Sequence, residues 1–295
     1  MGMSQAAAAP RRLWALAVVM VLEGGFGPAA HAAPLFHMPI ACRVGDTCWI
    51  QKYVDTDAGA GFSDHQCGRL SNDGHKGTDF RLATQRDLAR DVAVLAAADG
   101  RVRAVRDGMP DISVNRIGLD ALNGRDAGNS VVIDHGDGWA TQYAHLKLGS
   151  VAVMPGARVR AGDVIGTVGL SGRTEFPHVH FEVRRDGDAV DPFTGQTMGT
   201  ECRAPARPLW SPAAAQALDY RPSAVLDIGF ALFPPVKQAA RAGAYHEVPL
   251  SAGSSMLLLW ADAMGVKAGD RQQFIIATDD GRRLLDRTLD IDAAK

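Results

Sequence analysis

The sequence has no strong charge of either sign and no long run of basic residues. Its 31 lysines and arginines nearly balance its 33 aspartates and glutamates, which gives a formal net charge of -2. This balance argues against a protein that binds nucleic acid through a basic surface, because phosphate contacts need clustered cations. Aromatic residues are also few, at 6%, whereas glycines number 32. That composition favours a turn-rich β architecture over a helical bundle.

Long hydrophobic runs are confined to the N-terminus. Arg11 and Arg12 precede an unbroken apolar run over residues 13–22, and an Ala-x-Ala motif follows at 30–32. A charged region, a short apolar core and an Ala-x-Ala site in this order are typical of a secretory signal peptide. The run is too short for a membrane span, and a retained anchor is the alternative interpretation. We therefore expect residues 1–32 to be removed, and the mature protein to be exported without a stable membrane span.

Cysteine is scarce, and no two cysteines stand at the C-x-x-C spacing. The four cysteines are Cys42, Cys48, Cys67 and Cys202. Their spacing disfavours a four-cysteine zinc site. An even number in an oxidising compartment instead predicts two disulfides, for which three connectivities exist. We favour Cys42–Cys48, which closes a small loop, and Cys67–Cys202, which ties the start of the central region to its end.

The length of 295 residues allows one large or two ordinary domains. Residues 33–66 form a predicted ordered lead-in with the favoured Cys42–Cys48 disulfide and a strand near 49–55. A central domain is predicted over residues 67–202. Short apolar segments alternate there with tight turns, at Asp99-Gly100 and again within 130–146. Each turn predicts a hairpin, and together they predict a compact, mostly antiparallel β domain.

The last part of the chain, residues 203–295, opens with a proline-rich linker. Strand-like runs then occur at 224–230, 255–260 and 272–277. These predict a small β-sandwich of immunoglobulin-like type. No cluster of ligand-type residues occurs in this part. We interpret it as an accessory or binding module, and as the place where a regulatory partner would bind.

The most informative stretch is the predicted strand over residues 176–183. Its period of two puts His178, His180 and Glu182 on one face, and leaves the apolar residues between them for a core. Two imidazoles side by side on a strand suit a metal site, because neutral imidazole is a good zinc ligand. Glu182 is either a carboxylate that orients one of these histidines or part of a polar strand surface.

A second histidine and a carboxylate occur earlier. His75 and Asp79 stand four residues apart, and the glycines around them favour a turn that enters a strand. Both residue types are competent zinc ligands. The alternative is a loop histidine with a turn-forming aspartate. Further along, His145 ends a predicted strand, after Tyr143, for which we expect a packing role.

Taken in order, these segments resemble the lysostaphin-type (LytM-like) zinc metallopeptidases. The resemblance covers roughly residues 67–195. It rests on five motifs, which are Gly74-His75-Lys76-Gly77-Thr78-Asp79-Phe80, Ala98-Asp99-Gly100-Arg101-Val102, Tyr143-Ala144-His145-Leu146, Ala161-Gly162-Asp163-Val164-Ile165-Gly166 and His178-Val179-His180-Phe181-Glu182-Val183.

The resemblance implies a role for each residue. His75, Asp79 and His180 would hold Zn²⁺ and leave a fourth position for water, as a catalytic site requires. His178 would be the general base or transition-state stabiliser, with His145 as its partner. Because this family cleaves the peptides of bacterial cell-wall peptidoglycan, the resemblance implies a zinc metalloendopeptidase with a peptidoglycan peptide as its substrate. A location in the periplasm or cell envelope fits that substrate.

Three alternatives belong to other functional classes. A catalytically silent LytM-like domain that binds and activates a cell-wall amidase would be expected to lack zinc ligands, and this chain keeps all three. The glycine-rich hairpins also resemble biotinyl or lipoyl carriers, but no Met-Lys-Met or Asp-Lys-Ala attachment turn is present. A structural zinc site would normally have a fourth protein ligand. We therefore favour the active peptidase.

Overall fold

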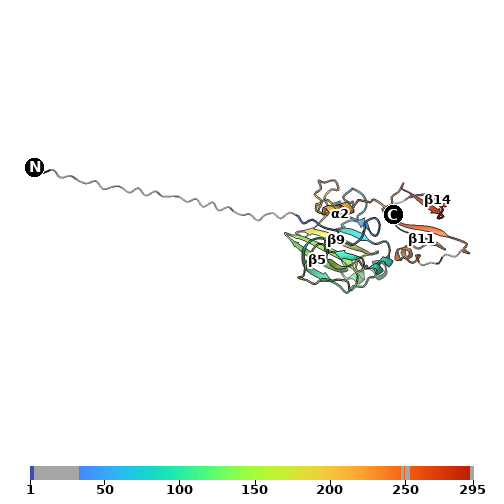
Figure 1. The fold of residues 1–295 in the computed structure, drawn as a ribbon, viewed down its shortest axis with the longest axis horizontal. Coiled ribbons are helices and arrows are strands. Elements are labelled where there is room, and N and C mark those ends of the chain that lie inside the picture. Colours follow the sequence, from blue (N-terminus) through green and yellow to red (C-terminus); the bar gives the residue numbers. More distant parts are fainter. Residues whose placement is uncertain (3–32, 247–248, 250–252, 293–295) are drawn as a thin grey trace. The chain divides into compact units, whose positions relative to one another are not determined.

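A computed structural model describes residues 1–2, 33–246, 249 and 253–292 (Figure 1). The predicted signal peptide at 1–32 lies outside these residues apart from its first two. The chain divides into two units, residues 1–32 and 33–295, and the second is described below. Among the helices that the structure describes, none has the length and apolar character needed to cross a membrane.

The fold is mainly β, as predicted. The strands are β1 (Trp49–Lys52), β2 (Thr78–Arg81), β3 (Ala93–Leu95), β4 (Gly100–Arg106), β5 (Asn129–Gly136), β6 (Trp139–Leu146), β7 (Arg158–Val159), β8 (Val164–Thr167), β9 (His178–Arg185), β10 (Asp188–Val190), β11 (Ala224–Ala231), β12 (Leu258–Met264), β13 (Arg271–Ala277) and β14 (Arg283–Asp290). The helices are η1 (Gln85–Arg90), α1 (Val114–Ile117), η2 (Asp120–Leu122), α2 (Pro212–Ala217) and α3 (Lys237–Ala242), of which η1 and η2 are 3₁₀ helices.

An eight-stranded antiparallel sheet carries the candidate site. Its strands follow the order β1-β2-β9-β6-β5-β4-β7, and β10 also pairs with β9. The first half of β9 lies beside β2 on one side, and the second half lies beside β10. Strand β6 borders β9 on the other side. Strand β9, labelled in Figure 1, therefore has hydrogen-bonded neighbours on both sides, which fixes the position of each of its side chains.

The apolar side chains of β9 confirm the predicted alternation. Val179, Phe181 and Val183 are fully buried in the main core. Phe36 from the lead-in and Trp210 from the segment before α2 pack in the same core, and both rings contact Phe181. This core therefore combines side chains from before, within and after the central region.

One predicted hairpin is wrong and the other is confirmed. Strands β5 and β6 pair as expected. Strands β3 and β4 do not pair with each other, because β3 pairs with β8 in a separate two-stranded sheet and β4 pairs with β5 and β7. The Asp99 carboxylate accepts a hydrogen bond from Ala161 N (2.8 Å), so the turn is tied to a distant loop. The strands separate at this Asp-Gly turn because each has a more distant partner.

The lead-in is an integral part of the large sheet. Its predicted strand is present as β1, which pairs with β2. Both favoured disulfides are present, Cys42–Cys48 and Cys67–Cys202. In the C-terminal part, β11 pairs with β12 and β13 pairs with β14 as two-stranded antiparallel sheets. The predicted strands are therefore found, whereas the immunoglobulin-like sandwich stays a prediction.

Candidate metal centre

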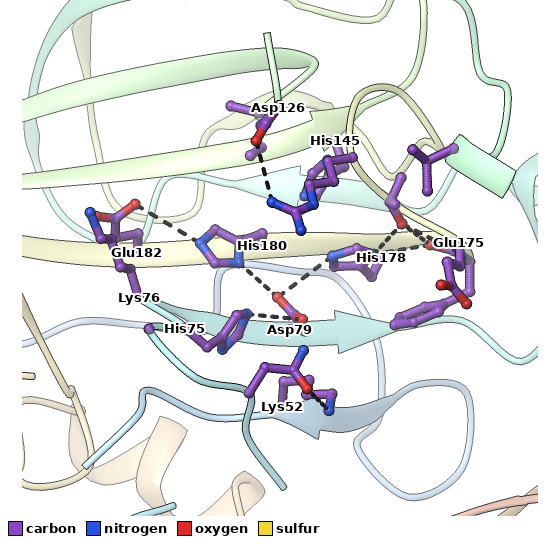
Figure 2. A pocket seen from close by; sticks show the side chains of 18 of the residues that line it. Lys52, His75, Lys76, Asp79, Asp126, His145, Glu175, His178, His180 and Glu182 are labelled. Carbon is purple, nitrogen blue, oxygen red and sulfur yellow. Dashed lines mark hydrogen bonds and ion pairs between the residues drawn. The ribbon is translucent and has the colours of Figure 1, made fainter. Parts of the chain in front are cut away.

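Strand pairing brings the first two predicted ligands together. Asp79 of β2 lies directly opposite His180 of β9. Directly opposite residues of an antiparallel pair project from the same face, so both side chains enter one cleft, as Figure 2 shows. The Asp79 Oδ1 atom lies 2.8 Å from His180 Nδ1.

His75 reaches the same point from the turn that precedes β2. Its Nε2 atom lies 3.2 Å from Asp79 Oδ2. Ligand atoms of His75, Asp79 and His180 all lie within 4.8 Å of one another, which is close enough for one metal ion to bind all three (Figure 2). The three side chains are buried or half-buried. Two imidazoles and one carboxylate form a donor set that suits zinc, with room for a further ligand.

His178 and His145 line the same cleft. His178 shares the face of His180 because they are two residues apart on β9, and its Nε2 atom lies 3.5 Å from Asp79 Oδ1. The ring centroids of His145 and His178 are 4.6 Å apart. The structure thus brings together all five residues predicted for the site.

His145 enters the cleft only because strand β6 is irregular there. Its neighbour Ala144 already lines the cleft, so regular alternation would turn His145 to the other face. The pairing with β5 shifts register at this point, between Asn129 and Val131. His145 has a φ of +63°, in the left-handed region. A bulge of this kind changes the direction of a side chain, and here it places His145 in the cleft beside His178.

Main-chain carbonyls fix the protonation pattern of three rings. The Nδ1 atoms of His75, His145 and His178 lie 2.8, 2.8 and 2.9 Å from the carbonyl oxygens of Tyr53, Ser171 and Phe176, in that order. A carbonyl oxygen only accepts, so each Nδ1 donates its proton to it. In the neutral ring this leaves the Nε2 lone pair free. Each of these Nε2 atoms can therefore bind a metal ion or accept a proton.

His180 has the opposite arrangement. Its Nδ1 faces Asp79, and its Nε2 lies 3.9 Å from Glu182 Oε2. Glu182 is buried and forms an ion pair with Arg184, with 2.7 Å between Oε1 and Nε. The exposed-surface interpretation of Glu182 does not fit this burial. The carboxylate instead stands where it can orient the ring of His180.

The electrostatics follow from burial and from the closeness of these groups. Burial would raise the pKa of Asp79, but His75, His178 and His180 together hold it well below its ordinary value. Burial lowers the pKa of His178, and burial with the neighbouring histidines lowers the pKa of His145 further. His145 and His178 are therefore neutral bases at neutral pH.

The cleft has a volume of about 550 Å³ and contains polar groups that the sequence alone did not single out. Lys52 donates to Asn72 Oδ1 (2.6 Å) at one side, and Arg173 pairs with Asp126 (3.7 Å) at another. None of these residues stands in a motif with recognisable spacing, because they lie on separate loops and on β1. Tyr143 is fully buried and does not line the cleft, which confirms its packing role.

Comparison with known proteins agrees with this geometry. Residues 73–192 match the profile of Peptidase family M23. DD-carboxypeptidase/endopeptidase Mpg of Neisseria meningitidis serogroup B is 43% identical over 79 residues, which cover 26% of this chain and 18% of that protein. Murein hydrolase activator EnvC of Escherichia coli is 38% identical over 100 residues, which cover 34% of this chain and 22% of that protein.

The chain therefore spans about a fifth of the length of these two relatives. Among solved structures, a zinc-containing peptidase from Vibrio cholerae aligns with 54% of this chain and 39% of its own, at 24% identity and a TM-score of 0.35. The profile match covers the five predicted site residues, which are His75, Asp79, His145, His178 and His180. The segment from residue 73 to residue 192 is a LytM-like domain of Peptidase family M23.

Proposed function

We propose that this protein is a zinc-dependent endopeptidase that hydrolyses peptide bonds in bacterial peptidoglycan. The observation that carries the proposal is the convergence of His75, Asp79 and His180 within 4.8 Å, beside two histidines with free Nε2 atoms. The M23 match and the endopeptidase relatives support the reaction class. The two disulfides and the predicted signal peptide support export to the periplasm or cell envelope.

The residues present fit a zinc ion. His75, Asp79 and His180 would hold it, and no fourth protein ligand stands with them among the residues that the structure describes. When bound, zinc supplies a Lewis acid for the peptide carbonyl and lowers the pKa of water. The remaining histidines would then handle protons.

Hydrogen bonding and burial prepare His178 and His145 for that task. Each ring is held by its Nδ1–H on a carbonyl oxygen, so the basic Nε2 atom points into the cleft. As the general base, His178 takes a proton from the attacking water and then carries it on Nε2 to the leaving amine. His145, 4.6 Å away between ring centroids, would hold the water or the oxyanion in place.

The test is to incubate the purified protein with cell-wall sacculi and to identify the released muropeptides. We expect new amino termini in the released peptides, and no release after zinc is removed by a chelator. Readdition of zinc should restore release. If the zinc-bound protein releases no muropeptides at any of the pH values tested, the proposal is wrong.

A second candidate function is activation of a cell-wall amidase without catalysis by this chain. The similarity to the murein hydrolase activator EnvC favours it. Under this alternative, the protein would increase the activity of a purified amidase, and the His178→Ala variant would do so equally well. The endopeptidase proposal instead requires the His178 variant to be inactive on sacculi by itself.

A further inference from the structure

We propose that Asp55 is a positioning residue of the metal centre, which holds the zinc ligand His75 from a segment that precedes the M23 match. The inference rests on the proposed function, because it concerns the zinc site. Residues 53–55 follow β1 in the lead-in, whereas the match begins at residue 73. Asp55 is 1% exposed and does not itself line the cleft.

Three hydrogen bonds run from this short segment to the turn that carries His75. Asp55 N donates to His75 O (2.8 Å), and Gly74 N donates to Asp55 Oδ2 (2.9 Å). The His75 ring donates from Nδ1 to Tyr53 O (2.8 Å). The backbone around His75 and the His75 ring are therefore both hydrogen-bonded to residues 53–55.

Two other hydrogen bonds hold this turn, from Lys52 Nζ to Asn72 Oδ1 (2.6 Å) and from His75 N to Asn72 O (3.0 Å). Asn72, Asp73 and Gly74 are exposed, and no atom lies within 4 Å of the position that a Cβ on Gly74 would occupy. Gly74 has a φ of +70°, a conformation that glycine adopts readily, and it has no side chain that could pack. No side chain packs at Gly74, so the turn is positioned through hydrogen bonds, and those to Asp55 and Tyr53 hold the backbone and the ring of His75.

The same segment is also in register with the second ligand. Lys52, the last residue of β1, is the partner of Asp79 in the β1–β2 pairing. Asp55 follows three residues later and holds the turn of His75. One continuous piece of chain thus fixes the separation between His75 and Asp79, on which a three-ligand site depends.

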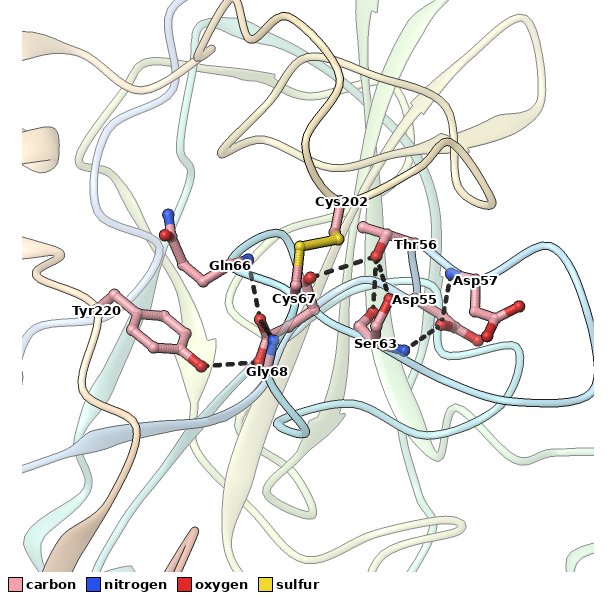
Figure 3. The surroundings of a disulfide bond; sticks show 10 residues. Asp55, Thr56, Asp57, Ser63, Gln66, Cys67, Gly68, Cys202 and Tyr220 are labelled. Carbon is pink, nitrogen blue, oxygen red and sulfur yellow. Dashed lines mark hydrogen bonds between the residues drawn. A yellow bond between two sulfur atoms is a disulfide. The ribbon is translucent and has the colours of Figure 1, made fainter.

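The Asp55 carboxylate is itself held on its other side. Its Oδ1 atom accepts from Asp57 N (3.0 Å) and Ser63 N (3.1 Å), as Figure 3 shows. The three backbone donors therefore share two oxygens, and each oxygen must accept. The side chain of asparagine has a single oxygen. When that oxygen accepts from Asp57 N and Ser63 N, the Asp55→Asn variant has no acceptor left for Gly74 N.

Asp64 provides a matched control in the next part of the lead-in. It is fully buried, and its two oxygens accept from the backbone of Gln66, Gly68 and Leu70. Tyr220 also donates to it, with 3.0 Å between the oxygens. Asp64 thus has the same chemistry and burial as Asp55 but no hydrogen bond to the turn of His75.

The experiment compares D55N and D64N in the full chain with its disulfides formed. The zinc dissociation constant is measured by competition with a chelator, and the unfolding midpoint of each metal-free protein is recorded. We expect D55N to raise the zinc dissociation constant by about 10- to 100-fold, the usual effect of losing a group that orients a ligand. D64N should lower the unfolding midpoint but leave the zinc dissociation constant within about threefold of wild type.

A zinc affinity unchanged in D55N would overturn the inference, and so would an equal loss of affinity in D64N. If D55N does not fold, amide hydrogen exchange in the metal-free wild type decides instead. Although Gly74 is an exposed residue, its N–H should then exchange at least about tenfold more slowly than its intrinsic rate, and unprotected exchange would contradict the role of Asp55. If the wild-type protein releases muropeptides and D55N binds zinc as tightly as wild type, the inference about Asp55 is wrong and the proposed function stands. Wild-type protein that binds no zinc would refute the proposed function as well.

Discussion

At the residue scale, the four histidines of the cleft differ in which ring nitrogen is tied to the protein. Three of them donate from Nδ1 to a carbonyl oxygen, whereas His180 presents Nδ1 to Asp79 and Nε2 to Glu182. Two neighbouring histidines on one strand can thus have separate tasks. In the proposed mechanism, His180 binds the metal and His178 handles the proton.

Two alanine variants test that separation. His180→Ala should abolish stoichiometric zinc binding, because it removes one of three ligands. His178→Ala should retain zinc and lose about 10²- to 10⁴-fold in turnover, the usual contribution of a general base. Zinc content by elemental analysis and muropeptide release measure the two effects. Stoichiometric zinc in the His180 variant would refute the ligand assignment.

The sequence predicted which side chains meet, but not how they are held. The period of two on 176–183 is a local property, so the shared face of His178 and His180 follows from the sequence. The acceptors that fix their rings are main-chain carbonyls, such as those of Phe176 and Ser171. Any residue type supplies a carbonyl, and for this reason the sequence carries no signal for these contacts.

At the scale of elements, the irregularity in β6 determines where His145 points. The left-handed backbone conformation of His145 costs a non-glycine residue roughly 1–2 kcal/mol of stability, whereas glycine adopts it readily. His145→Gly should therefore be at least as stable as His145→Ala, and we expect an advantage of up to about 1 kcal/mol. Glycine elsewhere in a strand is less stable than alanine. Urea unfolding of the two variants measures the difference, and a clearly more stable alanine variant would argue against the bulge.

The turn that follows β10 gives a pH-dependent prediction. Asp191 is 1% exposed, and burial raises its pKa from 3.8 to about 7. The folded protein thus keeps a proton that the unfolded chain releases, and this contribution to stability is complete below pH 4 and lost as the pH rises through 7. Asp191→Asn keeps the neutral form at every pH.

We therefore expect the free energy of unfolding of D191N, relative to wild type, to increase from pH 5 to pH 8 by a few kcal/mol. Urea unfolding of both proteins at the two pH values measures this difference. Because it is a difference between proteins, the titration of the cleft histidines cancels. A difference that is constant with pH would show that Asp191 ionises normally in the folded protein.

Elements also show where local sequence reasoning fails. The turn at Asp99-Gly100 has a strong local hairpin signal, yet β3 pairs with β8 and β4 with β5. Strand pairing depends on partners far along the chain, and the turn residues do not encode them. The Asp-Gly turn within 130–146 was predicted correctly, because its two strands are each other's neighbours in the sheet.

At the scale of the whole molecule, the two disulfides close loops of very different length. Cys67 and Cys202 are 135 residues apart, whereas Cys42 and Cys48 are 6 apart. A longer loop restricts the unfolded chain more, so loop-entropy estimates give about 5 kcal/mol for the first and about 2 kcal/mol for the second. The C67A/C202A variant should accordingly be less stable than C42A/C48A by about 3 kcal/mol.

Urea unfolding of the oxidised variants measures this order of stability. The reduced wild type serves as the reference that lacks both constraints. Equal losses in the two variants would mean that local contacts, rather than loop length, determine what each disulfide contributes.

The order of the cysteines has a consequence for the way the chain matures. Each cysteine pairs with the next one along the sequence, first Cys42 with Cys48 and then Cys67 with Cys202. A chain that enters an oxidising compartment from its N-terminus presents its thiols in that same order. An oxidant that joins thiols as they arrive would produce the native pairs directly, so maturation would require an oxidase but no isomerase to rearrange wrong pairs.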